Sequence, residues 1–195
     1  LDLLAVEKTS GKSKYSEQAK TAIADIKSKL INGAIQEGTN KNFSAASAKL
    51  KAVYDLDKTD MEKLYYAANY AVNAKDYDTA LNYYGELKKL NFSGESTSYY
   101  AKSAVSEQEE FFGSDAAAKT DRDQKVRLKL FSNPRDEKVP SKRGEIYKNI
   151  ALILVEKGKT EEAKTALKEA REANPDDTAL AISEADLYLN LEDYK

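Results

Sequence analysis

The sequence predicts an all-α fold in which antiparallel helix pairs stack into an array. Apolar residues recur every three or four positions in 147–154 and again in 163–170, which is the spacing of one helix face. Lys157-Gly158-Lys159 separates the two segments, and Asn174-Pro175 ends the second. A helix pair of this kind buries only one of its sides, so it requires a neighbouring pair to cover the other.

A spacing of 34 positions recurs along the chain. It relates Ala151 to Ala185 and Leu154 to Tyr188 in the C-terminal part. In the N-terminal part it relates five further pairs, namely Phe43 and Tyr77, Ala46 and Ala80, Leu50 and Tyr84, Val53 and Leu87, and Leu56 and Leu90. A fixed spacing of this size is typical of helical repeat proteins.

The pattern resembles the tetratricopeptide repeat of bacterial repeat proteins. The resemblance is carried by Tyr147, Ile150, Ala151, Leu154, Ala163, Leu167, Ala170 and Pro175, and it covers 27–110 and 144–195. It implies a right-handed superhelix of antiparallel helix pairs, an α-solenoid. We therefore expect a single array over 1–195, with repeats at 16–58, 59–93, 96–143, 144–177 and 178–195, of which the third is degenerate and the last incomplete.

Local patterns predict each helix of the first two repeats. Apolar residues from Ala19 to Ile35 predict a long helix that begins after Ser16 and ends near Gly38. A second helix follows over 43–56. Residues 59–62, with the sequence Thr-Asp-Met-Glu, predict a capping box for a third helix, whose packing stripe is Leu64, Ala67, Ala68 and Ala71. The fourth helix, 77–87, returns after a turn at Lys75-Asp76.

The repeat register fails after Phe112. We expect a third pair to begin near Ser96, with Tyr100, Ala104 and Phe111 on one side, and an insertion to follow. Within the insertion, 115–123 favours a helix, 125–130 alternates like a strand, and 133–140 is expected to be loop because it contains two prolines. The sequence leaves helix and strand open here. The loss of register predicts a mobile excursion.

The segment 119–143 also carries nine Lys or Arg against four Asp or Glu, although the net charge of the chain is -2. Such a segment could contact phosphates, an acidic protein or anionic lipid. It offers only Phe131 for stacking on bases, so we expect no nucleic-acid partner. A solvated, lysine-rich insertion is the favoured interpretation.

The residue types present argue against enzyme chemistry. The chain contains no His and no Cys, so the commonest general base, thiol nucleophiles and soft metal ligands are absent. We expect no catalytic residues, no metal site and no cofactor. The absence of Cys also excludes disulfides.

The family resemblance implies a binding site in the concave groove, which the first helix of each pair lines. The residues expected there are Glu62, Tyr65, Asn69, Val72 and Asn73 in the second repeat, Glu145, Lys148, Leu152, Val155 and Glu156 in the fourth, and Ile182, Asp186 and Asn190 in the last. Asn69 and Lys148 resemble part of a clamp that some relatives use on a peptide carboxylate. The remaining basic positions are out of register, so no clamp is predicted.

These observations predict a non-enzymatic scaffold that binds a peptide or a partner protein in the groove. The alternative is a purely structural segment of a longer repeat protein, and a weaker one is an anionic-ligand or nucleic-acid module through 119–143.

The sequence begins at Leu1 without Met. A removed signal peptide would place the protein in the periplasm or outside the cell, and otherwise we expect the cytoplasm. No apolar run approaches the ~20 residues that cross a bilayer, so no transmembrane segment is expected.

Overall fold

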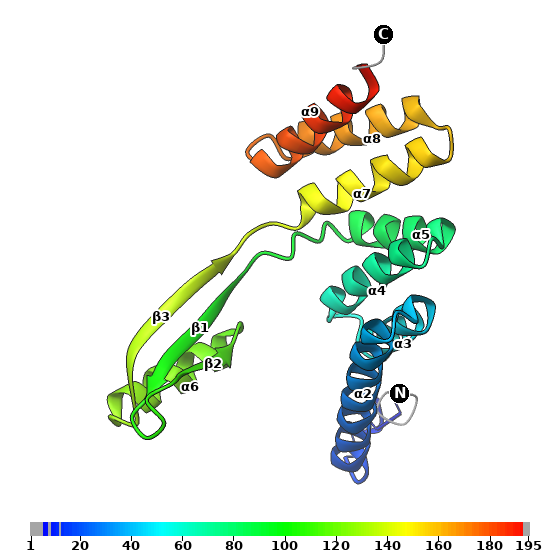
Figure 1. Cartoon of the computed structure of the whole chain (residues 1–195). Coiled ribbons are helices and arrows are strands. Elements are labelled where there is room, and N and C mark those ends of the chain that lie inside the picture. The colour runs from blue at the N-terminus through cyan, green and yellow to red at the C-terminus, as the bar shows by residue number, and fades with distance from the viewer. Residues whose placement is uncertain (1–5, 8, 12, 193–195) are drawn as a thin grey trace. The chain divides into compact units, whose positions relative to one another are not determined.

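The computed structural model describes residues 6–7, 9–11 and 13–192 (Figure 1). Contacts divide the chain into two compact units, Leu1–Phe92 and Ser93–Lys195, called here the N-terminal and C-terminal units. Within the described ranges, no helix combines the length and apolar character that a membrane span requires. The single array over 1–195, with its five repeats, stays a prediction.

The N-terminal unit consists of consecutive helices joined by short turns, in the order α2 (Ser16–Thr39), α3 (Phe43–Leu56), α4 (Met61–Asn73) and α5 (Tyr77–Lys89). Each helix packs against the next, and turns this short make neighbours antiparallel. The predicted turn before α5 is confirmed, since Lys75 has φ 60 and the Asp76 carboxylate accepts a 3.2 Å hydrogen bond from Thr79 N. The predicted capping box before α4 is wrong. No side chain caps that helix, because Thr59 instead binds Asp57.

Burial confirms the repeat spacing. Ala46 and Ala80 are both fully buried, as are Val53 and Leu87, although 34 positions separate the members of each pair. Positions of α3 and α5 that are 34 residues apart are therefore buried to the same extent. The helix pairs are tetratricopeptide-like, as the sequence predicts.

Gly38 of α2 leaves room for the Tyr70 side chain of α4. A Cβ atom on Gly38 would lie 2.3 Å from the hydroxyl oxygen of Tyr70 and 2.8 Å from its ring carbon Cζ. The Tyr70 ring is held in place by stacking on Phe43, with 6.2 Å between ring centroids. The sequence predicted that α2 ends near Gly38, and α2 ends one residue later at Thr39. Gly38 is thus required for packing rather than for chain reversal.

We expect Gly38→Ala to lower the free energy of unfolding by about 1 to 3 kcal/mol, because the added methyl group overlaps the Tyr70 ring. Gly85→Ala in α5 is the matched control. No atom lies within 4 Å of its added Cβ, so it should raise stability by about 0.5 to 1 kcal/mol through helix propensity. Urea denaturation measures both. A gain in stability from Gly38→Ala would contradict the close approach.

The C-terminal unit contains a second group of helices, α7 (Arg143–Glu156), α8 (Thr160–Ala173) and α9 (Thr178–Glu192). Helix α7 contacts both α8 and α9. The core between them consists of Ile146, Ile150, Ala151, Ile153, Ala163, Leu167, Ala170, Leu180 and Leu187. Ala151 is buried, but its repeat equivalent Ala185 is exposed. The 34-residue spacing therefore does not extend to equal burial at this position of α9.

A three-stranded antiparallel sheet precedes these helices, with β1 (Ser96–Ser103) between β2 (Glu109–Gly113) and β3 (Phe131–Val139). Helix α6 (Ala116–Arg127) packs on it, and we call residues 96–139 the sheet module (Figure 1). A 2.7 Å hydrogen bond from Lys142 N to Ser93 O joins the two segments that lead into and out of this module.

The sheet module corrects three expectations and confirms one. No helix begins near Ser96, 125–130 is not a strand, and most of 133–140 is not loop, whereas the helix over 115–123 is confirmed as part of α6. The reason lies in β3, an edge strand whose residues are mostly polar and exposed, so it lacks an alternating apolar pattern. An edge position also tolerates Pro134, which has no N–H to donate.

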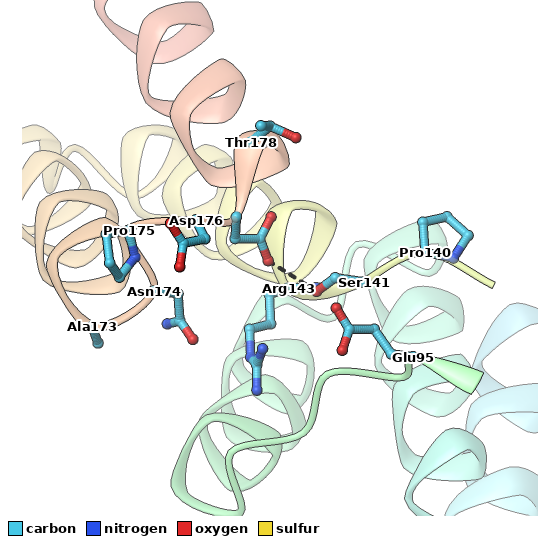
Figure 2. Close-up of a pocket in the computed structure, with 10 residues that line it drawn as sticks. Glu95, Pro140, Ser141, Arg143, Ala173, Asn174, Pro175, Asp176 and Thr178 are labelled. Atoms are coloured by element: carbon cyan, nitrogen blue, oxygen red, sulfur yellow. Dashed lines mark hydrogen bonds between the residues drawn. The ribbon is translucent and has the colours of Figure 1, made fainter. Parts of the chain in front are cut away.

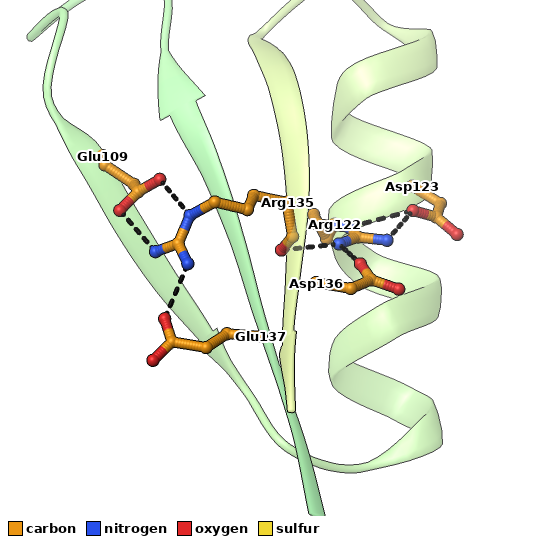
Figure 3. A network of polar contacts seen from close by, with 6 residues as sticks. All are labelled: Glu109, Arg122, Asp123, Arg135, Asp136 and Glu137. Atoms are coloured by element: carbon orange, nitrogen blue, oxygen red, sulfur yellow. Dashed lines mark hydrogen bonds and ion pairs between the residues drawn. The ribbon is translucent and has the colours of Figure 1, made fainter. Parts of the chain in front are cut away.

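Two arginines tie the sheet module together (Figure 3). The buried Arg122 of α6 pairs with Asp136 of β3 and with Asp123, donates a 3.2 Å hydrogen bond to the carbonyl oxygen of Arg135, and lies 5.1 Å from the Tyr99 ring centroid. Its contacts outside α6 come from Arg135 and Asp136 of β3 and from Tyr99 of β1. Arg122 therefore joins α6 to the sheet.

Arg135 forms the second centre, on β3. Its Nε and Nη2 atoms lie 2.9 and 2.8 Å from the two carboxylate oxygens of Glu109, its Nη1 lies 2.6 Å from Glu137, and its guanidinium lies 4.3 Å from the Tyr100 ring centroid. These hydrogen bonds lower the pKa of Glu109. Arg122, Lys125 and Arg135 of 119–143 are thus paired with carboxylates, and the expected excursion forms regular structure.

Candidate peptide-binding surface

The predicted groove residues of α4 do not share one surface. Tyr65 is only 3% exposed, and its ring centroid lies 5.2 Å from that of Tyr66 and 6.3 Å from that of Phe92. Asn69 is half-buried, and its side-chain oxygen accepts a hydrogen bond from the Tyr84 hydroxyl. Tyr65 belongs to the core, so its placement as an exposed groove residue is wrong.

The error has a geometric cause. The prediction used one packing stripe for α4, but α4 packs against both α3 and α5 and so buries a wider face. That face consists of Leu64, Tyr65, Ala67, Ala68 and Ala71. Glu62 and Asn73 are exposed and Val72 is half-buried, so these residues lie around the remaining surface.

Sequence reasoning missed Tyr66, which is 39% exposed and presents the most exposed aromatic ring of α4. Its hydroxyl lies 3.4 Å from the Glu62 carboxylate one turn earlier. An analysis that packs α4 against both α3 and α5 would have identified Tyr66 as exposed, because Tyr66 lies outside the wide buried face.

Predicted residues of α7 and α9 do come together on one surface. The Nζ atom of Lys148 lies 3.2 Å from Oδ2 of Asp186, and both side chains are nearly half exposed. Leu152 is one helical turn after Lys148 and Ile182 one turn before Asp186, and both apolar side chains are exposed. We call these four residues the α7–α9 surface.

A shallow depression lies within this surface. It is lined by Lys148, Ala151, Leu152, Ser183, Asp186 and Leu187. The small residues allow the two helices to approach, and Ser183 donates a 3.1 Å hydrogen bond to the carbonyl oxygen of Gly144. Ala151 and Ser183 thus lie between the helices, and the charged pair and Leu152 lie beside them.

The remaining predicted residues of these helices are less informative. Glu145 and Glu156 are exposed and Val155 is half-buried, while the side chain of Asn190 lies outside the described residues. Lys148 pairs with Asp186, and Asn69 is bound to Tyr84 in the other unit.

A larger cavity of about 520 Å³ lies between the segments that flank the sheet module and the α8–α9 turn (Figure 2). Glu95, Pro140 and Ser141 line one part of it and the α8–α9 turn lines another, and the side chain of Arg143 extends between Glu95 and Asn174. The Ser141 hydroxyl donates a 2.9 Å hydrogen bond to Asp177 and accepts one from Arg143 N. These bonds fix the turn, and they do not form a nucleophile activated by a base.

The described residues also lack a metal-binding arrangement. No group of three or more carboxylates converges within the part of the chain that the structure describes. Burial raises the pKa of Tyr147 on α7, which keeps its hydroxyl neutral rather than preparing it as a base. The most developed arrangement among the predicted residues is thus the α7–α9 surface.

Comparisons with known proteins give a weak likeness. No family model and no curated protein sequence matches the chain. Among solved structures, the chain is similar to YrrB, described as a TPR protein with an unusual peptide-binding site, at 15% identity over 83% of this chain and 58% of YrrB, with a TM-score of 0.43. The chain thus spans less than two thirds of YrrB.

Two further structures show similarity. TTC0263, a thermophilic TPR protein of Thermus thermophilus, shares 17% identity over 85% of this chain and 82% of its own, with a TM-score of 0.31. Pseudomonas aeruginosa pilF shares 14% identity over 89% and 72%, with a TM-score of 0.27.

Proposed function

We propose that the chain is a non-enzymatic scaffold that binds a peptide or partner helix on the α7–α9 surface. The observation that supports this most is the pairing of Lys148 with Asp186 across two first helices of successive pairs, beside the exposed Leu152 and Ile182. A ligand segment could bury the two aliphatic side chains and exchange hydrogen bonds with the two charges. The absence of His and Cys from the sequence favours binding over catalysis.

A test of this proposal exchanges the two charges. Peptides are first selected from a displayed library on the 195-residue chain. Their affinity is then measured by fluorescence anisotropy for the parent and for the double variant Lys148→Asp with Asp186→Lys. The exchange keeps an ion pair between α7 and α9, so melting should stay within about 0.5 kcal/mol of the parent. Peptide affinity should fall at least about tenfold, because the polarity of the site is inverted.

Lys29→Ala is the matched control, since Lys29 is an exposed lysine on α2. It should leave peptide affinity unchanged. If the exchanged variant and Leu152→Ser both bind the selected peptides as tightly as the parent, the α7–α9 surface is not the binding site.

One observation favours the structural alternative, a segment of a longer repeat protein. Ile182, Ala185 and Leu189 form an exposed apolar stripe on α9 at helical spacing. Ala151, the equivalent of Ala185, is covered by α9 itself. A further helix pair would cover the α9 stripe in the same way. Equal peptide binding by all variants would favour this alternative.

A further inference from the structure

Three aliphatic side chains are exposed at one end of the sheet module. Val105, on the turn between β1 and β2, is 93% exposed, and Leu128 and Leu130, which follow α6, are 62% and 53% exposed. A 2.9 Å hydrogen bond from Ala104 N to the carbonyl oxygen of Leu130 joins the two turns. The three side chains therefore belong to one end of the module, which we call the tip.

The tip lies at the end of the sheet module opposite to the point where the chain enters and leaves it. β1 leads toward it and β3 leads away from it, so the chain enters and leaves the module at the opposite end (Figure 1). The eight residues of β1 span roughly 26 Å at the usual rise of a strand. Three aliphatic groups that are each more than half exposed contribute little to the core of the module, and grouped exposed apolar side chains mark interaction sites.

Unpaired positive charge surrounds the tip. Arg127 and Lys129 flank Leu128 and are exposed, and within the described residues neither side chain takes part in an ion pair or hydrogen bond. Elsewhere in the module the cations of Arg122, Lys125 and Arg135 are held by carboxylates. One acid, Glu107, is exposed on the same end. Lys102, Lys119 and Lys138 of the module also take part in no ion pair among the described residues, but Arg127 and Lys129 are the cations directly beside the exposed Leu128.

We propose that the tip docks on a lipid bilayer that contains anionic headgroups. Val105, Leu128 and Leu130 enter the headgroup region, and Arg127 and Lys129 contact the lipid phosphates and carboxylates. Aliphatic and cationic side chains on one surface are the combination that interfacial membrane binding uses. Each cation close to an anionic bilayer strengthens binding about fivefold. This surface is separate from the peptide-binding surface proposed above.

Two observations favour lipid over other partners. Leu and Val are under-represented among the residues that dominate protein–protein binding, where Trp, Tyr and Arg prevail. Nucleic acid is disfavoured because Phe131, the aromatic residue nearest to Leu130 in sequence, is half-buried and packs edge-on against Phe112 with 5.0 Å between ring centroids. It cannot stack on a base without leaving that contact.

The absence of Trp from the chain permits a direct test of insertion. Val105→Trp places the single tryptophan at the tip, and Ile35→Trp places it at an exposed site on α2 as the matched control. Vesicles of phosphatidylcholine containing about a third phosphatidylserine are then added to each variant. We expect a blue shift of emission for Val105→Trp alone, and none with pure phosphatidylcholine. Unchanged emission from Val105→Trp, or an equal shift from Ile35→Trp, would overturn the proposal.

Sedimentation with the same vesicles tests the individual side chains. Leu128→Ser with Leu130→Ser should reduce the partition coefficient at least about tenfold, and Arg127→Gln with Lys129→Gln about 25-fold. Leu90→Ser, at an exposed leucine after α5, should leave it unchanged. Circular dichroism shows whether each variant is folded. If a variant is unfolded, the tryptophan experiment alone decides the proposal. Binding that the leucine changes leave intact, or equal binding to single-stranded RNA, would show a polyanion contact and reject the lipid proposal.

Discussion

Tyr65→Ala should lower the free energy of unfolding by about 3 to 5 kcal/mol, the range for removing a buried aromatic side chain. Tyr65 of α4 is almost fully buried and its ring packs against those of Tyr66 and Phe92, so its removal leaves a cavity in the core. Urea denaturation followed by circular dichroism measures the loss.

Tyr66→Ala is the matched control, because the neighbouring ring is substantially exposed. It should cost less than about 1 kcal/mol. Equal losses from the two variants would contradict the burial of Tyr65. A stable Tyr65→Ala protein that loses peptide binding would restore Tyr65 as a binding residue.

Leu167→Ala should destabilise the C-terminal unit by about 2 to 5 kcal/mol. Leu167 is fully buried on α8, within the core that α7 and α9 complete. Hydrogen exchange followed by mass spectrometry is the appropriate measurement, since it reports α7, α8 and α9 separately from α2 to α5.

Protection should fall in α7, α8 and α9 and persist in α2 to α5 if the two compact units open separately. Leu189→Ala, at an exposed leucine of α9, provides the control and should alter protection by less than about 0.5 kcal/mol. A uniform loss of protection along the whole chain would show that the two units unfold as one.

The helices could be predicted because the information for them is local and repeated. Ala46, Leu50 and Val53 recur as Ala80, Tyr84 and Leu87, and all six are buried. Two helices thus give the same information about each position. A repeated pattern of small and large residues at helical spacing is compatible with few structures other than packed helices. The same register placed Lys148 and Asp186 at equivalent faces of their helices, and the two side chains form an ion pair.

The sheet module could not be predicted from local patterns. β3 is stabilised by pairing with β1 and by the ion pairs of Arg135 and Asp136, and the partners Glu109 and Arg122 lie elsewhere in the sequence. Polar edge strands carry no alternating signal of their own. The sequence therefore suggested a solvated insertion, whereas Arg135 and Asp136 form ion pairs with residues of β2 and α6.

The placement of Tyr65 failed for a related reason. A stripe analysis considers one helix and one partner, whereas α4 has α3 on one side and α5 on the other. With two neighbouring helices, Tyr65, which follows the packing residue Leu64, lies in the core instead of on the surface. First helices in the interior of a repeat array should therefore be analysed with two neighbours.

The hydrogen bond between Lys142 N and Ser93 O affects how this chain can vary. The whole sheet module leaves and re-enters at two residues that already touch, so its removal would require only a tight turn between them. Insertions whose ends meet in this way leave the host fold undisturbed. We therefore expect that replacing the sheet module with a short turn would leave α7, α8 and α9 folded, because the two chain ends that must be joined already lie together.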